Sequence, residues 1–172
     1  ETENAKLRGV AVSSVISRDY NYKEIGAHLV GYISEINKRQ LPRLKKKLGF
    51  DYKLGDSIGQ AGLEEQEDLN LRGKDGYHFV EVDAKGRIRS YMPSDGVFQG
   101  IKNRPPIPGN NIRLTIDKDL QLSAYNALEG KVGSAVAVDI NTGEVLAMVS
   151  RPSFDPSQFS RGISTDYWSS LV

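Results

Sequence analysis

Residues 134–150 read SAVAVDINTGEVLAMVS, and this stretch decides the fold class. Two apolar runs of strand length, 134–140 and 144–150, flank Asn141, Thr142 and Gly143. The pattern predicts a β-hairpin whose turn takes its positive φ angles from Asn141 and Gly143, because these residue types tolerate such angles.

Both runs of this hairpin are apolar with little alternation, which is typical of strands covered on both faces of a larger sheet. Two strands cannot cover both of their own faces, so we expect another part of the protein or a second molecule to complete the sheet. Failing that, the apolar faces and free edges are expected to pack on the rest of the chain, to pair between chains in self-association, or to fray.

A strand and a helix are predicted just upstream of the hairpin. Residues 112–116, IRLTI, have the composition of a strand, and Asp117 is a typical cap for a helix that ends near Gly130. The segment 93–111 is rich in Pro and Gly, so it is predicted to be a loop or an extended linker.

The N-terminal part of the chain predicts short elements. We expect strands at 10–17 and in a hairpin over 77–92 that turns at 84–86, and helices at 24–33 and 62–71. Residues 37–40, NKRQ, have the form of a capping box for a further helix ending at Gly49. The fold class is therefore α+β: a β-rich region with short helices and hairpins, followed by a hairpin from an incomplete sheet.

The composition excludes several classes of function. The 172 residues carry a net charge of +1, which is too weak a field to indicate a nucleic-acid partner. Without Cys there are no disulfides, thiol nucleophiles or cysteine-ligated zinc. No apolar run approaches the ~18 residues of a membrane span. We expect no cofactor and no metal.

Catalytic residues are not indicated either. His28 and His78 lack partners at ligand spacing, and each is expected to be structural; a stand-alone hydrolase that uses one of them is the remaining alternative from the enzyme class. A serine–lysine acyltransferase needs Ser and Lys one helical turn apart as S-x-x-K, and the sequence contains no such pair.

Six ordered motifs resemble the class B penicillin-binding proteins, and more closely the elongation type within that class. They are HLVGYISEIN (28–37), IGQAGLE (58–64), LRGKDG (71–76), VDAKGR (82–87), LTIDKDLQ (114–121) and AVDINTGEVLAMVSRPSFDPSQF (137–159). The resemblance implies a bacterial inner-membrane protein with one transmembrane helix, a periplasmic non-catalytic pedestal and a D,D-transpeptidase domain that cross-links peptidoglycan.

This resemblance also implies a domain division. Residues 1–111 are expected to form the pedestal, 112–132 a connecting strand and helix, and 133–172 the start of the transpeptidase domain. Since S-x-x-K, S-x-N and K-T-G are absent, we expect the chain to be non-catalytic as it stands and to position the catalytic domain at the periplasmic face of the membrane. A self-contained binding module is the alternative.

The partners implied by the resemblance are an MreC-like rod-shape scaffold, a SEDS-family glycosyltransferase and the transpeptidase domain itself. Tyr20, Tyr22 and Phe98 are the candidate partner-binding residues, as exposed aromatics. The family's opening arginine segment is missing, so Glu64 is expected to be unpaired or to use Arg72. The candidate structural motif residues are Gly62, Leu63, Glu64, Arg72, Gly73, Gly76, Asp117, Asp139 and Gly143.

Overall fold

The computed structural model describes residues 18–44, 52–77, 79–86, 88–90, 103–160 and 162–171. Within them lie short helices and three two-stranded antiparallel sheets, so the predicted α+β class is confirmed. The elements are, in chain order, η1 (Lys23–Ile25), α1 (Ala27–Val30), β1 (Ile33–Glu35), α2 (Leu41–Leu44), β2 (Ser57–Gly59), α3 (Gly62–Gln66), α4 (Asp68–Leu71), β3 (Glu81–Val82), β4 (Ile88–Ser90), α5 (Lys118–Ala127), β5 (Gly133–Val138), β6 (Val145–Arg151), α6 (Ser157–Ser160) and α7 (Thr165–Leu171).

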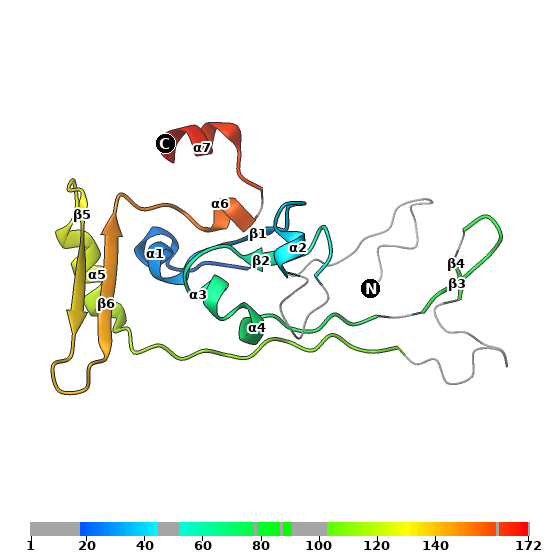
Figure 1. Cartoon of the computed structure of the whole chain (residues 1–172), viewed down its shortest axis with the longest axis horizontal. Helices are drawn as coiled ribbons and strands as arrows, with labels where there is room; N and C mark the ends of the chain where they lie inside the picture. Colours follow the sequence, from blue (N-terminus) through cyan, green and yellow to red (C-terminus); the bar gives the residue numbers. More distant parts are fainter. Residues whose placement is uncertain are drawn as a thin grey trace, which may run out of the picture.

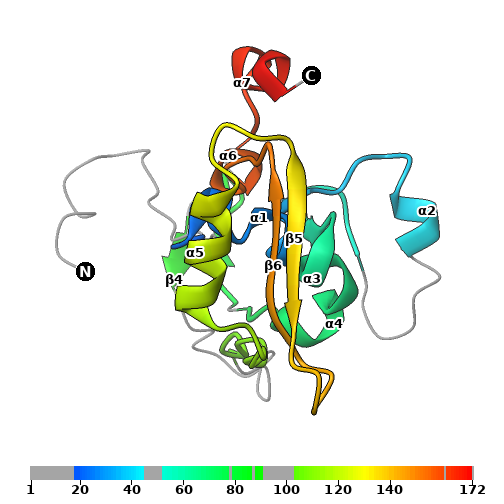
Figure 2. The same cartoon turned by 90° about the vertical axis from the view of Figure 1, so that its left-hand side faces the viewer.

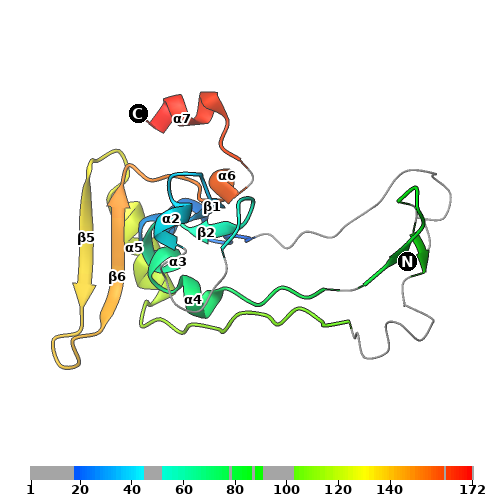
Figure 3. The ribbon, with the colours of Figure 1, turned by 45° about the vertical axis from the view of Figure 1, so that its right-hand side comes forward.

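These elements form an elongated molecule. The β5–β6 hairpin and α5 lie at one end, a central body holds α1 to α4 with the β1–β2 pair, and the β3–β4 hairpin lies at the far end (Figure 1). Strand β6 lies between β5 and the body, so β5 is the outermost strand (Figures 1 and 3). In the described part of the chain, no helix is long and apolar enough to cross a bilayer.

The predicted helix over 24–33 is wrong in extent. It is divided at Gly26 into the 3-10 helix η1 and the single turn α1, and α1 ends at Gly31, whose φ is 78°. Glycine takes this angle without the steric penalty that other residues suffer, so the chain can turn there and continue as a strand. Ile33, expected in the helix, instead begins β1 and pairs with Gly59 of β2.

The capping box at 37–40 is confirmed. Asn37 Oδ1 accepts hydrogen bonds from the amides of Arg39 and Gln40, each at 3.0 Å, and Gln40 Oε1 accepts from the Asn37 amide at 3.2 Å. These bonds satisfy amides that a helix start leaves without partners. Helix α2 follows directly. The expected continuation to Gly49 lies outside the described residues.

A small core holds the central body together. Ile36, Tyr52 and Ile58 are buried against one another, with Leu41 and Leu44 of α2 packed on them. Such a small apolar cluster offers limited hydrophobic stabilisation. Two buried polar side chains, Glu64 of α3 and Asp68 of α4, also lie in the interior.

The predicted helix over 62–71 is interrupted once. Glu67, at φ −103° and ψ 17°, separates α3 from α4, and the amide of Glu67 still bonds to Leu63 O at 2.8 Å. Glu64 and Asp68 lie four residues apart and are both buried. Side chains at this spacing share one face, and here that face is turned to the interior of the body.

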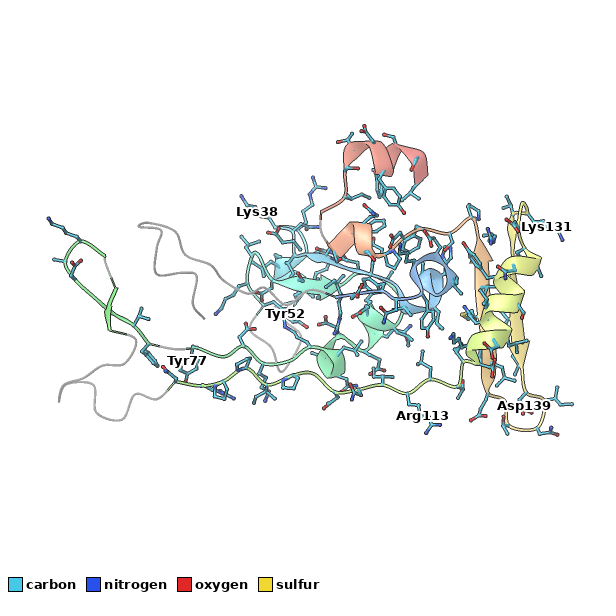
Figure 4. The ribbon with its side chains drawn as sticks, turned by 180° about the vertical axis from the view of Figure 1, so that it is seen from behind. Lys38, Tyr52, Tyr77, Arg113, Lys131 and Asp139 are labelled. Atoms are coloured by element: carbon cyan, nitrogen blue, oxygen red, sulfur yellow. The ribbon has the colours of Figure 1, made fainter. Side chains whose placement is uncertain are left out.

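Two extended segments lead from the body to the β3–β4 hairpin and form a narrow ribbon. Lys74 and Ile107 exchange backbone hydrogen bonds of 2.7 and 2.9 Å, and Tyr77 and Arg104 exchange two of 2.8 Å. The hairpin turns over 83–86, as predicted, and Gly86 has a φ of 76°. Tyr77 lies on the part of the ribbon nearer to the β3–β4 hairpin (Figure 4).

The strand predicted at 112–116 is wrong, whereas the following helix is confirmed. Residues 112–117 are extended without a strand ladder, and they contact β6 through two bonds, from Thr115 Oγ1 to Val145 O at 2.6 Å and from the Asp117 amide to Leu146 O at 2.8 Å. Isolated bonds of this kind do not build a ladder. Helix α5 begins after Asp117 and reaches Ala127.

The β5–β6 hairpin forms as predicted, with Gly133 opposite Arg151 and Val138 opposite Val145. Gly143 has a φ of 77°, but Asn141 does not adopt a positive φ, so that part of the turn prediction is wrong. The physical reason is that Asp139 shapes the turn instead: its Oδ1 accepts from the Asn141 amide at 2.8 Å.

Candidate functional site

The carboxylate of Glu64 is the centre of a buried polar network in the body. Glu64 is 6% exposed, and Arg18 Nε lies 3.1 Å from its Oε1. Arg18 Nη2 also donates to Leu71 O at 3.2 Å, so the same guanidinium joins α3 to the end of α4. The expectation that Glu64 is unpaired or uses Arg72 is therefore wrong.

Arg72 has another carboxylate within reach. Its Nη2 donates to Asp56 Oδ2 at 2.8 Å and its Nη1 to Ser57 O at 3.0 Å, while the guanidinium carbon lies 4.8 Å above the Tyr52 ring. These contacts direct Arg72 toward the start of β2 and away from Glu64. The sequence could not reveal this choice, because both partners of Arg72 lie 15 and 16 residues before it in the chain and no local pattern links them.

Burial dominates the electrostatics of this network. It raises the pKa of Glu64 above its ordinary value of 4.5, although the Arg18 charge opposes the shift. Burial, followed by the negative charge of Glu64, raises the pKa of Tyr20 to about 12. Tyr20 is only 9% exposed and its hydroxyl accepts a hydrogen bond from the Ile33 amide at 3.1 Å, so the expectation that Tyr20 is an exposed aromatic is wrong.

Asp68 forms the second half of the network. Its Oδ2 accepts from the Tyr52 hydroxyl at 2.8 Å and its Oδ1 from the Gly59 amide at 3.1 Å. Burial, and then the hydrogen bond to Asp68, raise the pKa of Tyr52 to about 12. Tyr52 lies in the middle of the body (Figure 4). Bonded on both sides, Asp68 ties α4 to the core and to β2.

This network has a structural role. Among the described residues, no group of three or more His, Asp or Glu side chains could hold a metal ion, and no buried side-chain polar atom lacks a hydrogen-bond partner. A cavity of about 180 Å³ beside the network is lined by Glu64, Asp68 and Arg72. Fully bonded and buried, Glu64 and Asp68 stabilise the body.

Gly62 and Gly73 stand where two backbones approach closely. Gly62 has a φ of 60°, and a Cβ there would lie 2.6 Å from Leu29 O; at Gly73 a Cβ would lie 2.2 Å from Ile107 O. Neither distance is compatible with a side chain. Gly76 meets Pro106 in the same way in the ribbon, and Leu63 is half-buried beside Gly62.

The remaining predicted motif residues act locally. Asp117 Oδ1 accepts from the Leu120 amide at 2.8 Å and caps α5. Asp139 and Gly143 shape the tip of the β5–β6 hairpin, where Asp139 is drawn in Figure 4. These three residues determine where elements begin and turn.

Gln121 is a residue that sequence reasoning missed. It lies on α5, is 5% exposed, and forms hydrogen bonds with Met148 of β6 and with Ile25 O of η1. A signal was present in the sequence, because Gln121 shares the inner face of the helix with Ala124 and Leu128 at the spacing i, i+3, i+7. A polar side chain on such a face needs partners there.

The η1–α1 segment makes two further contacts with the chain after β6. Ser153 Oγ donates to Glu24 O at 2.6 Å, and His28 Nε2 donates to Pro152 O at 3.0 Å. The Phe154 ring packs edge-on against His28 with ring centroids 5.3 Å apart. The ring centroids of Tyr32 and Phe159 are 4.1 Å apart. His28 is thus a contact residue; His78 lies outside the described residues.

An apolar groove of about 450 Å³ lies where η1 and α1 meet the extended segment before α5. Tyr22 lines it and is 55% exposed, whereas Phe98 lies outside the described residues. Arg113 and Lys118 are its charged lining residues, and the Arg113 side chain extends away from the ribbon (Figure 4). The other lining residues are Ile25, Gly26, Leu29, Val30, Ile112, Leu114, Ile116, Gln121 and Leu122.

Comparison with known families divides the chain near the start of α5. Residues 1–114 match the penicillin-binding protein dimerisation domain, and residues 133–171 match the penicillin-binding protein transpeptidase domain. Gln121 belongs to neither matched range.

Curated relatives agree with these matches. The chain is 40% identical over 167 residues to the peptidoglycan D,D-transpeptidase MrdA of Salmonella typhimurium (strain SL1344), covering 96% of this chain and 25% of that protein. It is 37% identical over 170 residues to penicillin-binding protein 3 of Bacillus subtilis (strain 168), covering 99% of this chain and 23% of that protein. The chain therefore spans about a quarter of the length of these relatives.

Solved structures with the same fold include two penicillin-binding proteins 2. The Pseudomonas aeruginosa protein, in complex with WCK 5153, has a TM-score of 0.66 at 36% identity, over 90% of this chain and 28% of that one. The Helicobacter pylori protein, in complex with MreC, has a TM-score of 0.67 at 26% identity, over 90% of this chain and 26% of that one. With the dimerisation domain matching two thirds of its length, the chain belongs to the penicillin-binding protein family that joins this domain to a transpeptidase domain.

Proposed function

We propose that this chain is the pedestal of a peptidoglycan D,D-transpeptidase together with the start of its catalytic domain. In this proposal residues 1–111 form the pedestal, 112–132 connect, and 133–172 begin the transpeptidase sheet. Its task is to hold the catalytic domain at a set position on the periplasmic face of the inner membrane. The chain itself performs no acyl transfer.

The observation that carries this proposal is the attachment of η1 and α1 to the hairpin end of the molecule. Glu24 O, Ile25 O and the His28 ring each bond to residues 121–153. Hydrogen bonds that join one domain to the start of the next are suited to positioning. The buried carboxylates of Glu64 and Asp68 are engaged in bonds within the body.

We further propose that the pedestal binds an MreC-like protein, as the similar Helicobacter pylori protein does in its solved complex. Of the aromatic residues predicted to bind a partner, Tyr22 is the one that the structure describes as exposed, and it borders the apolar groove. A SEDS-family glycosyltransferase is the second proposed partner, on the resemblance of the motifs alone.

Binding of this chain to the periplasmic part of MreC from the same organism tests the proposal. Saturable binding is expected by biolayer interferometry, and Tyr22→Ala should weaken it about fivefold or more, because Tyr is enriched among the few residues that dominate the binding energy of an interface. Tyr77→Ala is the matched control, since Tyr77 is 52% exposed but lies in the ribbon. Absence of saturable binding contradicts the partner, and labelling of the chain by fluorescent penicillin contradicts the non-catalytic role.

A further inference from the structure

We propose that Gln121 is the positioning residue that sets the orientation of the transpeptidase sheet on the pedestal. The inference rests on the proposed function, which identifies the two parts as the pedestal and the start of the transpeptidase domain. Its test measures only the distance between these parts. Three hydrogen bonds of one buried side chain carry it.

Gln121 bonds to the edge of β6 that is not paired with β5. Val136 and Met148 are opposite each other in the β5–β6 ladder. Gln121 Oε1 accepts from the Met148 amide at 2.8 Å, and Gln121 Nε2 donates to Met148 O at 2.8 Å. Both backbone groups of Met148 therefore point away from β5, as they do in a non-hydrogen-bonded antiparallel pair. The side-chain amide takes the place of a neighbouring strand.

The same side chain also bonds to the pedestal. Gln121 Nε2 also donates to Ile25 O, at 2.9 Å. A glutamine amide has two N–H donors, so both are occupied, one on the sheet edge and one on η1. One planar group thus fixes Met148 relative to Ile25, and it does so in a buried site where unpaired polar groups are costly.

Gln121 differs from the other residues that join the two parts. Ser153 and His28 each supply one hydrogen bond between the two parts, and His28 is exposed to solvent. Gln121 is buried and bonds both parts at once. Met148 would otherwise present a free strand edge, which is a site for incorrect pairing. Figure 2 shows α5 beside β6, with the α1 region behind them.

Other side chains cannot reproduce this geometry. Glutamate at position 121 keeps the shape but replaces the two donors with an oxygen, which then faces Ile25 O and Met148 O. Methionine keeps the length and loses every hydrogen bond. Both changes should release the orientation of the two parts, while the hydrogen-bonded ladder of β5 and β6 remains.

The chain has no Cys, so two introduced cysteines can be spin-labelled without a background signal. Lys38→Cys in the pedestal and Val132→Cys before β5 are suitable, because Lys38 is exposed and Val132 is 89% exposed. Double electron–electron resonance then reports the distance distribution between the parts. We expect one narrow distribution in the parent pair and a broadened or shifted one with Gln121→Glu or Gln121→Met. The exposed Gln158→Glu is the matched control and should leave it unchanged.

A thermal melt of the same samples separates positioning from stability. A lower melting temperature with an unchanged distance distribution overturns the proposal, because the residue is then structural only. Should both variants fail to fold, amide exchange in the unaltered chain decides. The Met148 amide is expected to be protected far more than the Val136 amide, which faces the outer edge of β5; equal, fast exchange of the two overturns the proposal.

Discussion

The hydroxyl of Tyr52 donates a hydrogen bond to Asp68 across 2.8 Å, and both residues are buried. Tyr52→Phe removes this donor and leaves one carboxylate oxygen without it. Because a buried acceptor that loses its partner costs about 1–3 kcal/mol, the free energy of unfolding should fall by that amount. Urea titration followed by fluorescence measures it.

Tyr77→Phe is the control for this prediction, since Tyr77 is 52% exposed. It should change the free energy of unfolding by less than about 0.5 kcal/mol. Equal effects of the two substitutions would show that the Tyr52–Asp68 bond contributes nothing of its own.

Glu64 should make stability fall with rising pH. Its folded pKa lies above the ordinary value of 4.5, so the folded state retains a proton that the unfolded state releases. The stabilisation is fully present below 4.5 and is lost as the pH rises through the folded pKa. Glu64→Gln cannot titrate, so its stability relative to the parent chain should improve as pH rises.

Urea titrations of the parent chain and Glu64→Gln from about pH 4 to pH 7 test this slope. A relative stability that moves in the opposite direction would mean that the Arg18 ion pair, rather than burial, controls the carboxyl. Exposed Glu65→Gln serves as the control and should show little dependence.

Gly62→Ala should destabilise the chain more than Gly55→Ala does. Both glycines have positive φ, at 60° and 93°, but a Cβ would meet Leu29 O at 2.6 Å only at Gly62, since nothing lies within 4 Å of the position at Gly55. Strain alone costs about 1–2 kcal/mol, and the clash adds to it at Gly62. Thermal unfolding compares them; matching shifts would rule out the close approach as the reason for Gly62.

The exposed face of the β5–β6 hairpin should promote self-association. Val136, Val138 and Met148 are 56%, 50% and 39% exposed on neighbouring strand positions. Sedimentation velocity should show a concentration-dependent increase in the parent chain that Val138→Lys reduces, because a charge opposes strand pairing. A monomer at every concentration would leave this face without a role in association.

Local patterns were enough to predict the hairpin at 134–150, the helix after Asp117 and the capping box at Asn37. The helix over 24–33 failed because the apolar spacing extends through Gly26 and Gly31, and the tight contact of Gly31 with Ala61 is non-local. The strand at 112–116 failed because composition cannot show whether a ladder partner is present.

The candidate site was predicted in part. Gly62, Leu63 and Glu64 were found as a motif, but the choice of Arg18 as the partner of Glu64 depends on how the chain before η1 returns to α3. The spacing places Gln121 on the inner face of α5, but its partners are backbone groups of Ile25 and Met148, which carry no signature in the sequence. Hydrogen bonds between a side chain and backbone groups far away in the sequence depend on how the whole chain folds, and any residue type can supply such backbone groups.

The two segments of the ribbon are packed most tightly where they leave the body. There they run so close together that a Cβ on Gly109 would lie 2.0 Å from Leu71 O, just as a Cβ on Gly73 would meet Ile107 O. Glycine at both positions lets the two backbones approach closely, and two isolated bridges, Lys74–Ile107 and Tyr77–Arg104, hold the segments together beyond this point. The β3–β4 hairpin thus lies far from the body on two segments whose close packing at Gly73 and Gly109 leaves no space for a larger residue (Figure 3).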